Sequence, residues 1–120
     1  MPLLDVIDET FVVAPPPVVA AAVKDPAFWA EVFPGLELTV FQDRGDEGIR
    51  LTVTGALVGS NEFWIEPWGD GAIVHYYLRA DPVGRVSPRR AVKLRTRHCV
   101  RLKAGLNAIK DRLEAARSSR

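Results

Sequence analysis

The last third of the chain carries a long apolar stripe at helical spacing. Within residues 88–117, the apolar residues on one helical face are Val92, Cys99, Leu102, Leu106, Ile109, Leu113 and Ala116. They recur at steps of three, four and seven residues, which is the period of an α-helix with one buried face. A helix over about residues 91–116 would be roughly 40 Å long and would cross a whole small domain. We therefore expect the preceding residues to form the surface on which this helix lies.

Those preceding residues predict an antiparallel sheet. Runs of β-branched and apolar residues alternate with glycine, proline and aspartate, which are typical of turns. The expected strands are residues 3–13, 36–42, 49–58, 61–68 and 72–80. Gly59 and Ser60 are expected to form a two-residue hairpin loop, and residues 81–88 a linker to the long helix.

Two short helices, 18–23 and 27–33, are expected after the first strand. Proline is tolerated in a first helical turn, so the prolines at 15–17 can precede the first of them. Asp25 and Pro26 suit the N-cap and first position of the second. Ser87 is expected to cap the long helix. Arg89 and Arg90 would then stand where the helix dipole disfavours cations, unless the helix begins later or they hold an anion.

The composition narrows the class of protein. A single cysteine, Cys99, excludes an internal disulfide. The first residues do not read as a secretory signal, and the apolar stretch 12–23 is interrupted by prolines and too short to span a membrane. We expect one domain, residues 1–120, in the cytoplasm. His75, His98 and Cys99 are the only soft metal ligands and do not converge, so neither a metal nor another cofactor is expected.

The charges are divided unevenly along the chain. Residues 1–81 hold 4 basic and 13 acidic residues, a net charge of −9, whereas residues 82–120 hold 12 basic and 2 acidic residues, a net charge of +10. An acidic body therefore carries a basic helix. Its charges either complement the body or meet an anionic partner: a lipid headgroup, an acyl carrier or nucleic acid. Aromatic residues do not interleave with the basic ones, which argues against specific nucleic-acid binding.

Several segments resemble the START-like helix-grip (SRPBCC) superfamily, which includes the Bet v 1-like allergens and the polyketide cyclase/dehydrase group. The segments are FVVAPP at 11–16, DP at 25–26, Trp29 and PGL at 34–36. The segments GALVGS at 55–60, EFW at 62–64, DG at 70–71 and HYYLRADP at 75–82 look like a short actinobacterial branch of that group. The resemblance implies an α+β fold in which a curved antiparallel sheet of five or more strands wraps a long C-terminal helix. Members bind, carry or transform many apolar molecules.

Strands 61–68 and 72–80 carry the candidate site. If Gly69 and Asp70 form a two-residue loop, alternation of side chains divides these strands into two faces. One face is mixed and holds Glu62, Trp64, His75, Tyr77 and Arg79. The other is apolar and holds Phe63, Ile65, Val74, Tyr76 and Leu78.

The register decides which face meets the long helix. A strict loop at Gly59-Ser60 puts the mixed face on the same side as Leu51, Val53 and Leu57. We therefore expect the mixed face to line a cavity under the helix. A slip of one residue would reverse the faces, and the mixed face would then lie outside, held by cross-strand pairs.

The expected ligand-binding residues come from both faces and from the helix: Trp64, Tyr77, Leu51, Val53, Phe63, Tyr76, Leu102 and Leu106. Glu62, His75 and Arg79 could orient a ligand hydroxyl, carbonyl or carboxylate, and they are weak candidates for proton transfer. On the helix, Leu102, Leu106 and Ile109 are expected to face the sheet, and Arg97, Arg101 and Lys110 the solvent. Gly105 marks a close approach of ligand or sheet, or an ordinary surface position.

The function that these features favour is binding or carrying of a small hydrophobic ligand, such as a lipid, isoprenoid or polyketide, between sheet and helix. A polyketide aromatase/cyclase or dehydrase-type enzyme is one alternative, although we see no recognisable catalytic set. An interaction module that docks an anionic partner through the basic helix is another. The sequence leaves the ligand and the oligomeric state open.

Overall fold

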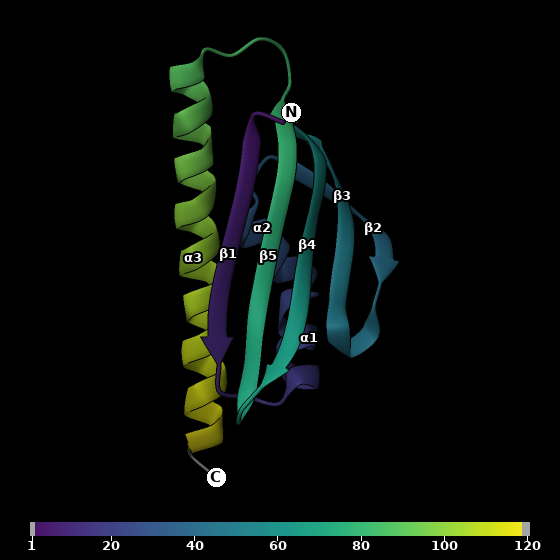
Figure 1. Cartoon of the computed structure of the whole chain (residues 1–120), viewed down its shortest axis with the longest axis vertical. Helices are drawn as coiled ribbons and strands as arrows, with labels where there is room; N and C mark the ends of the chain where they lie inside the picture. The colour runs from purple at the N-terminus through teal and green to yellow at the C-terminus, as the bar shows by residue number, and fades with distance from the viewer. Residues whose placement is uncertain (1, 119–120) are drawn as a thin grey trace.

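The computed structural model describes residues 2–118 as a five-stranded antiparallel sheet with three α-helices (Figure 1). The strands are β1 (Leu4–Val12), β2 (Leu36–Asp43), β3 (Gly48–Gly55), β4 (Leu57–Trp68) and β5 (Gly71–Pro82). The helices are α1 (Pro16–Val23), α2 (Pro26–Val32) and α3 (Pro88–Ser118), and a short 3-10 turn, η1 (Gly45–Glu47), joins β2 to β3. The strand order is β1-β5-β4-β3-β2. The expected α+β architecture is confirmed.

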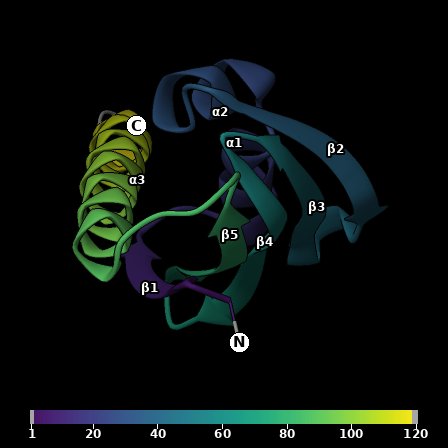
Figure 2. The same cartoon turned by 90° about the horizontal axis from the view of Figure 1, so that it is seen from above.

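The three helices lie on one side of the curved sheet. α3 runs along β1 for the whole length of the sheet (Figure 1). Seen from above, α2 stands between α3 and β2, so that sheet and helices surround a common interior (Figure 2). Leu102, Leu106 and Ile109 are buried in this interior, which confirms the predicted orientation of the apolar stripe. Among residues 2–118, no helix combines the length and the apolar character that crossing a membrane requires.

The two short helices begin as their sequences predict. In α2, the Asp25 carboxylate accepts a hydrogen bond from the Ala27 backbone N–H at 2.9 Å, as an N-cap does. The Trp29 indole N–H donates to the Val23 carbonyl at 2.7 Å and ties α2 to α1. The long helix begins at Pro88, where Ser87 Oγ accepts from the Arg90 N–H at 3.1 Å.

The hairpin between β3 and β4 turns at Ala56, so the expected loop at Gly59-Ser60 is wrong. Val53 lies opposite Gly59, and both Gly59 and Ser60 belong to β4. Gly55 takes the positive φ of +99° that the turn requires, and a Cβ there would lie 2.6 Å from the Gly35 carbonyl oxygen. Gly59 is needed for close strand packing, because a Cβ there would overlap the Arg79 carbonyl oxygen on β5.

This register also reverses the expected faces of the sheet. The apolar face points inward: Phe63, Ile65, Val74, Tyr76 and Leu78 are all at most 1% exposed. The mixed face points outward, away from α3. The prediction that the mixed face lines the sheet–helix space is therefore wrong, because the turn residues shift the pairing by an odd number of positions.

The buried face of α3 is rotated slightly from the predicted one. Val92 is 64% exposed, whereas His98 is buried in the interior. Cys99 is partly buried and packs against the core. Gly105 lies under α2: a Cβ there would overlap Val32 Cγ2 and approach Phe28 Cε1 to 3.0 Å. The close approach at Gly105 therefore comes from α2 rather than from the sheet or a ligand.

Basic side chains of α3 cover the free edge of β1. The donor and acceptor pairs are Arg95 Nε with Asp5 O at 3.3 Å, Lys103 Nζ with Glu9 O at 3.1 Å, and Lys110 Nζ with Phe11 O at 2.8 Å. An uncovered edge strand would offer these carbonyl oxygens to another chain. Part of the basic helix thus contacts the edge of the sheet.

Candidate functional site

A groove opens beside the first half of α3, between the end of α2, the start of β2 and the β3–β4 turn. It has a volume of about 240 Å³. Its lining residues are Val32, Phe33, Pro34, Leu36, Ala56, Leu57, Leu94, Arg97, His98 and Arg101. We call it the α2–α3 groove. All of these residues except Arg97, His98 and Arg101 are apolar, so the groove suits an apolar ligand whose few polar groups point toward α3.

A buried polar cluster joins this groove to the interior. The Tyr76 hydroxyl lies 2.7 Å from His98 Nε2, and Asn61 Nδ2 donates to the same hydroxyl at 3.1 Å. Tyr76 comes from β5, Asn61 from β4 and His98 from α3, so the cluster connects the sheet to the long helix. His98 also lines the groove. The cluster therefore reaches the groove through its imidazole.

Burial fixes the protonation states in this cluster. It lowers the pKa of His98 to about 4, so the imidazole is neutral near pH 7. It raises the pKa of Tyr76 well above the usual value, which keeps the hydroxyl protonated. The Tyr76 oxygen accepts a hydrogen bond from the Asn61 amide, so we assign the Tyr76 O–H to donate to His98 Nε2. The imidazole proton then resides on Nδ1.

One polar atom of the cluster is not satisfied. The Asn61 amide oxygen is buried and accepts no hydrogen bond from any residue in 2–118. A buried acceptor without a partner costs free energy, so native proteins rarely retain one without a reason. Asn61 is 3% exposed and lies on the inward face of β4 beside Phe63. The interior thus holds a polar position that a donor group would satisfy.

Aromatic rings pack around the cluster on the side of the groove and in the core. Phe33, which lines the groove, stacks on His98 with a centroid distance of 5.3 Å and on Tyr76 at 6.0 Å. Phe63 packs against Tyr76 at 4.9 Å. Phe33 and His98 together form part of the boundary between the groove and the core.

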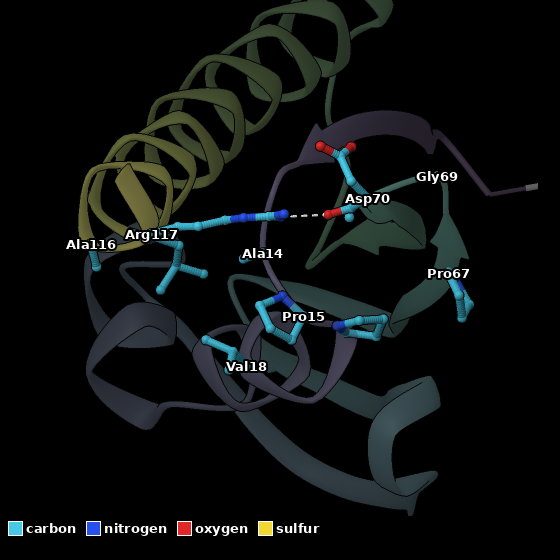
Figure 3. Close-up of a pocket in the computed structure, with 11 residues that line it drawn as sticks. Ala14, Pro15, Val18, Pro67, Gly69, Asp70, Ala116 and Arg117 are labelled. Carbon is cyan, nitrogen blue, oxygen red and sulfur yellow. Dashed lines mark hydrogen bonds between the residues drawn. The ribbon is translucent and has the colours of Figure 1, made fainter. Parts of the chain in front are cut away.

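A larger open hollow of about 580 Å³ lies at the opposite end of α3. Figure 3 shows Arg117 reaching across it, where its guanidinium donates to the Asp70 carbonyl at 2.6 Å. Pro15 and Val18 supply apolar lining. None of its polar lining side chains is buried, whereas His98 of the α2–α3 groove is. It therefore offers less for specific recognition than the α2–α3 groove.

The sequence-predicted residues are divided between the two faces of the sheet. Most of the expected ligand-binding residues have side chains buried in the sheet–helix interior: Leu51, Val53, Phe63, Tyr76, Leu102 and Leu106. Trp64 and Tyr77 lie on the outer face. A ligand-binding role for either group remains a prediction.

The three candidate catalytic residues all lie on the outer face, where Glu62 and Arg79 line one hollow with Tyr77 and His75 lies outside that hollow. His75 Nε2 lies 3.0 Å from Glu66 and its Nδ1 3.3 Å from Glu9, and its ring stacks on Trp64 at 4.3 Å.

Glu62 instead pairs with Arg44 and Arg50, each at 3.1 Å. Arg79 is exposed and makes no side-chain hydrogen bond or ion pair with any residue in 2–118. Within these residues, His, Cys, Asp and Glu side chains form no group of three that could hold a metal ion.

Sequence reasoning did not place Asn61 and His98 in a site. The signal for His98 was its spacing, because it stands four residues after Leu94 and four before Leu102 on the buried stripe. Asn61 stands two residues before Phe63, on the inward face that the reversed register hid.

No known protein-family profile and no curated protein matches this chain. Solved structures do match. The polyketide cyclase-like protein Cgl2372 from Corynebacterium glutamicum is 18% identical with a TM-score of 0.66, over 97% of this chain and 94% of that one. The di-domain aromatase/cyclase StfQ of the steffimycin pathway is 13% identical with a TM-score of 0.70, over 96% of this chain and 52% of that one.

The Zhui aromatase/cyclase from Streptomyces sp. R1128 is 17% identical with a TM-score of 0.55, over 92% of this chain and 93% of that one. At these identities the likeness concerns the fold. The chain therefore has the helix-grip fold of these aromatase/cyclases and polyketide cyclase-like proteins, as the resemblance in its sequence implies.

Proposed function

We propose that the protein binds a small hydrophobic ligand, of the lipid, isoprenoid or polyketide class, in the α2–α3 groove. The observation that carries this proposal is the position of His98. Its imidazole lines a largely apolar groove and is hydrogen-bonded to the buried Tyr76 hydroxyl. An apolar concavity with a few convergent polar groups is the usual form of a small-molecule site. The helix-grip fold supports the same function.

The size of the groove limits the ligand. A volume of about 240 Å³ is just under the roughly 300–1,000 Å³ of typical small-molecule sites. The ligand is therefore small, or part of it lies outside the groove. The neutral imidazole of His98 provides a hydrogen-bonding group for a ligand hydroxyl or carbonyl at the inner end.

Catalysis of the aromatase/cyclase or dehydrase type has weaker support. A general acid or base works best when its pKa lies near the operating pH. Burial moves the pKa of His98 down to about 4 and that of Tyr76 upward, so both move away from neutrality. The cluster is better suited to holding a ligand than to transferring its protons. The cytoplasmic location stays a prediction.

The neutral fluorescent probe phenylnaphthylamine (NPN) tests the proposal. We expect the wild-type protein to bind NPN with a rise in its fluorescence. Ala56→Trp should weaken binding by roughly tenfold or more, because Ala56 is exposed at the β3–β4 turn and an indole there would fill the groove. Ala104→Trp is the matched control, since Ala104 is exposed on α3 outside the groove lining.

Two results would reject the proposal. One is a wild-type protein that does not bind NPN. The other is an equal affinity for NPN in Ala56→Trp and the wild type, which would put the probe elsewhere on the protein.

A further inference from the structure

We propose that the ligand of the α2–α3 groove is an amphipathic anion: its apolar body lies in the groove and its acidic group lies on Arg97 and Arg101. This inference rests on the proposed function and names the chemical class of the ligand. It follows from how α3 distributes its positive charges between its two flanks.

The cations on one flank of α3 already have hydrogen-bond or ion-pair partners within the protein. Arg95, Lys103 and Lys110 lie on the side of α3 that faces β1, where they donate to backbone carbonyl oxygens. Lys103 Nζ also lies 3.3 Å from the Asp8 carboxylate. Lys110 also pairs with Glu114 at 2.8 Å. These contacts fix the helix to the sheet and leave this flank no role in the groove.

The cations on the opposite flank have no such partners. Arg90, Arg97 and Arg101 are separated by seven and four residues, so they fall on one side of the helix. All three are exposed, and their side chains make no hydrogen bond or ion pair with any residue in 2–118. No acidic residue stands between Asp81 and Asp111 to neutralise them.

Arg97 and Arg101 lie at the groove itself. They stand one helical turn apart and both line it, on either side of His98 in the sequence. Guanidinium groups bind carboxylate, sulfonate or phosphate oxygens through paired N–H donors. His98 adds no charge near pH 7, because burial keeps it neutral. The groove thus combines an apolar lining with two unpaired positive charges along one wall.

Two probes with the same ring system test this inference. Anilinonaphthalene sulfonate (ANS) and NPN share an anilinonaphthalene body, and ANS adds a sulfonate group. We expect the wild-type protein to bind ANS roughly tenfold more tightly than NPN, the effect of two partly exposed charge contacts. Added salt should weaken the binding of ANS and leave that of NPN nearly unchanged.

The double variant Arg97→Gln/Arg101→Gln should bind ANS and NPN about equally, with NPN affinity kept within roughly twofold of wild type. Retained NPN binding shows that the variant is folded. Arg79→Gln is the matched control, because Arg79 is an unpaired exposed arginine on the outer face of the sheet. It should keep the preference for ANS.

The outcomes separate the two proposals. If NPN binds in the groove but the double variant retains the preference for ANS, the assignment to Arg97 and Arg101 is overturned and the proposed function stands. If NPN does not bind, the proposed function fails. If anionic phospholipid vesicles sediment the protein through Arg97 and Arg101 while ANS shows no advantage over NPN, the arginines serve a membrane surface and the inference is overturned.

Discussion

The Tyr76 hydroxyl on β5 and His98 Nε2 on α3 lie 2.7 Å apart inside the protein. This hydrogen bond joins the middle of the sheet to the long helix at the inner wall of the α2–α3 groove. Tyr76 is fully buried and His98 is 7% exposed. Water therefore cannot easily replace either partner, and the contact affects both stability and ligand binding.

Tyr76→Phe should lower the free energy of unfolding by about 1–3 kcal/mol, because it leaves His98 and Asn61 without their partner. His98→Leu should lower the free energy of unfolding by a similar amount. The double variant should lose clearly less stability than the sum of the two single losses, since replacing both partners of the Tyr76–His98 hydrogen bond by apolar groups leaves only Asn61 without a partner. Urea unfolding of the four proteins measures the coupling, and strict additivity would show that the hydrogen bond contributes nothing.

Stability should depend on pH through His98. Its folded-state pKa of about 4 lies below its unfolded value of 6.5, so the unfolded chain binds more protons between these values. The contribution of His98 is present above about pH 6.5 and is lost as pH falls toward 4. The free energy of unfolding should drop by about 2 kcal/mol from pH 7 to pH 5.

The control for this pH dependence is His98→Leu, which lacks the titrating imidazole. Urea unfolding at the same two pH values should show a much flatter profile for the variant than for the wild type. An equally steep loss in both proteins would mean that other groups cause the acid sensitivity.

Gly105→Ala should destabilise the protein by about 1–3 kcal/mol, although alanine normally favours a helix by about 1 kcal/mol over glycine. The reason is steric, since the added Cβ would overlap Val32 and crowd Phe28 on α2. Val32→Ala removes the overlapping methyl group. In thermal unfolding, the double variant should be more stable than the two separate losses predict, and a stabilising Gly105→Ala would show that α2 does not pack there.

Lys103→Met should reduce stability by about 1 kcal/mol, a value discounted for the partial exposure of the ammonium group. Lys103 Nζ donates to Thr10 Oγ1 at 2.8 Å and Glu9 O at 3.1 Å, and so covers the edge of β1. Lys93→Met is the comparison, because Lys93 is exposed and makes no such contact. It should change the urea midpoint very little, and equal effects of the two substitutions would argue against the edge contact.

The elements that the sequence predicted well are those with strong local signals. The stripe from Leu102 to Ile109 predicted the buried face of α3, and the Asp25 and Ser87 caps marked where α2 and α3 begin. These signals come from neighbours within one or two helical turns, so no knowledge of the rest of the fold is needed.

The faces of the sheet could not be predicted because they depend on a single turn. Both Gly55 and Gly59 are reasonable turn residues in the sequence. Only the packed structure distinguishes them: Gly55 turns against Gly35, and Gly59 lets β4 approach β5. Placing the turn at Gly59 reverses the predicted faces of the sheet and wrongly places Trp64 and His75 in the interior.

The candidate site could not be predicted from the sequence for a similar reason. Asn61 lies on the inward face only in the true register, and His98 meets Tyr76 only because α3 packs over the inward face of the sheet. Both contacts join segments far apart in the chain. Local patterns in the sequence contain no information about such a meeting point.

The most direct test of hydrophobic ligand binding in the α2–α3 groove is an NMR titration of isotope-labelled protein with NPN. Saturable amide shift changes should concentrate at groove residues such as Phe33, Ala56 and His98. Changes concentrated at Gly69 and Gly71, which line the hollow at the other end of α3, would contradict the account. So would a spectrum that NPN leaves unchanged.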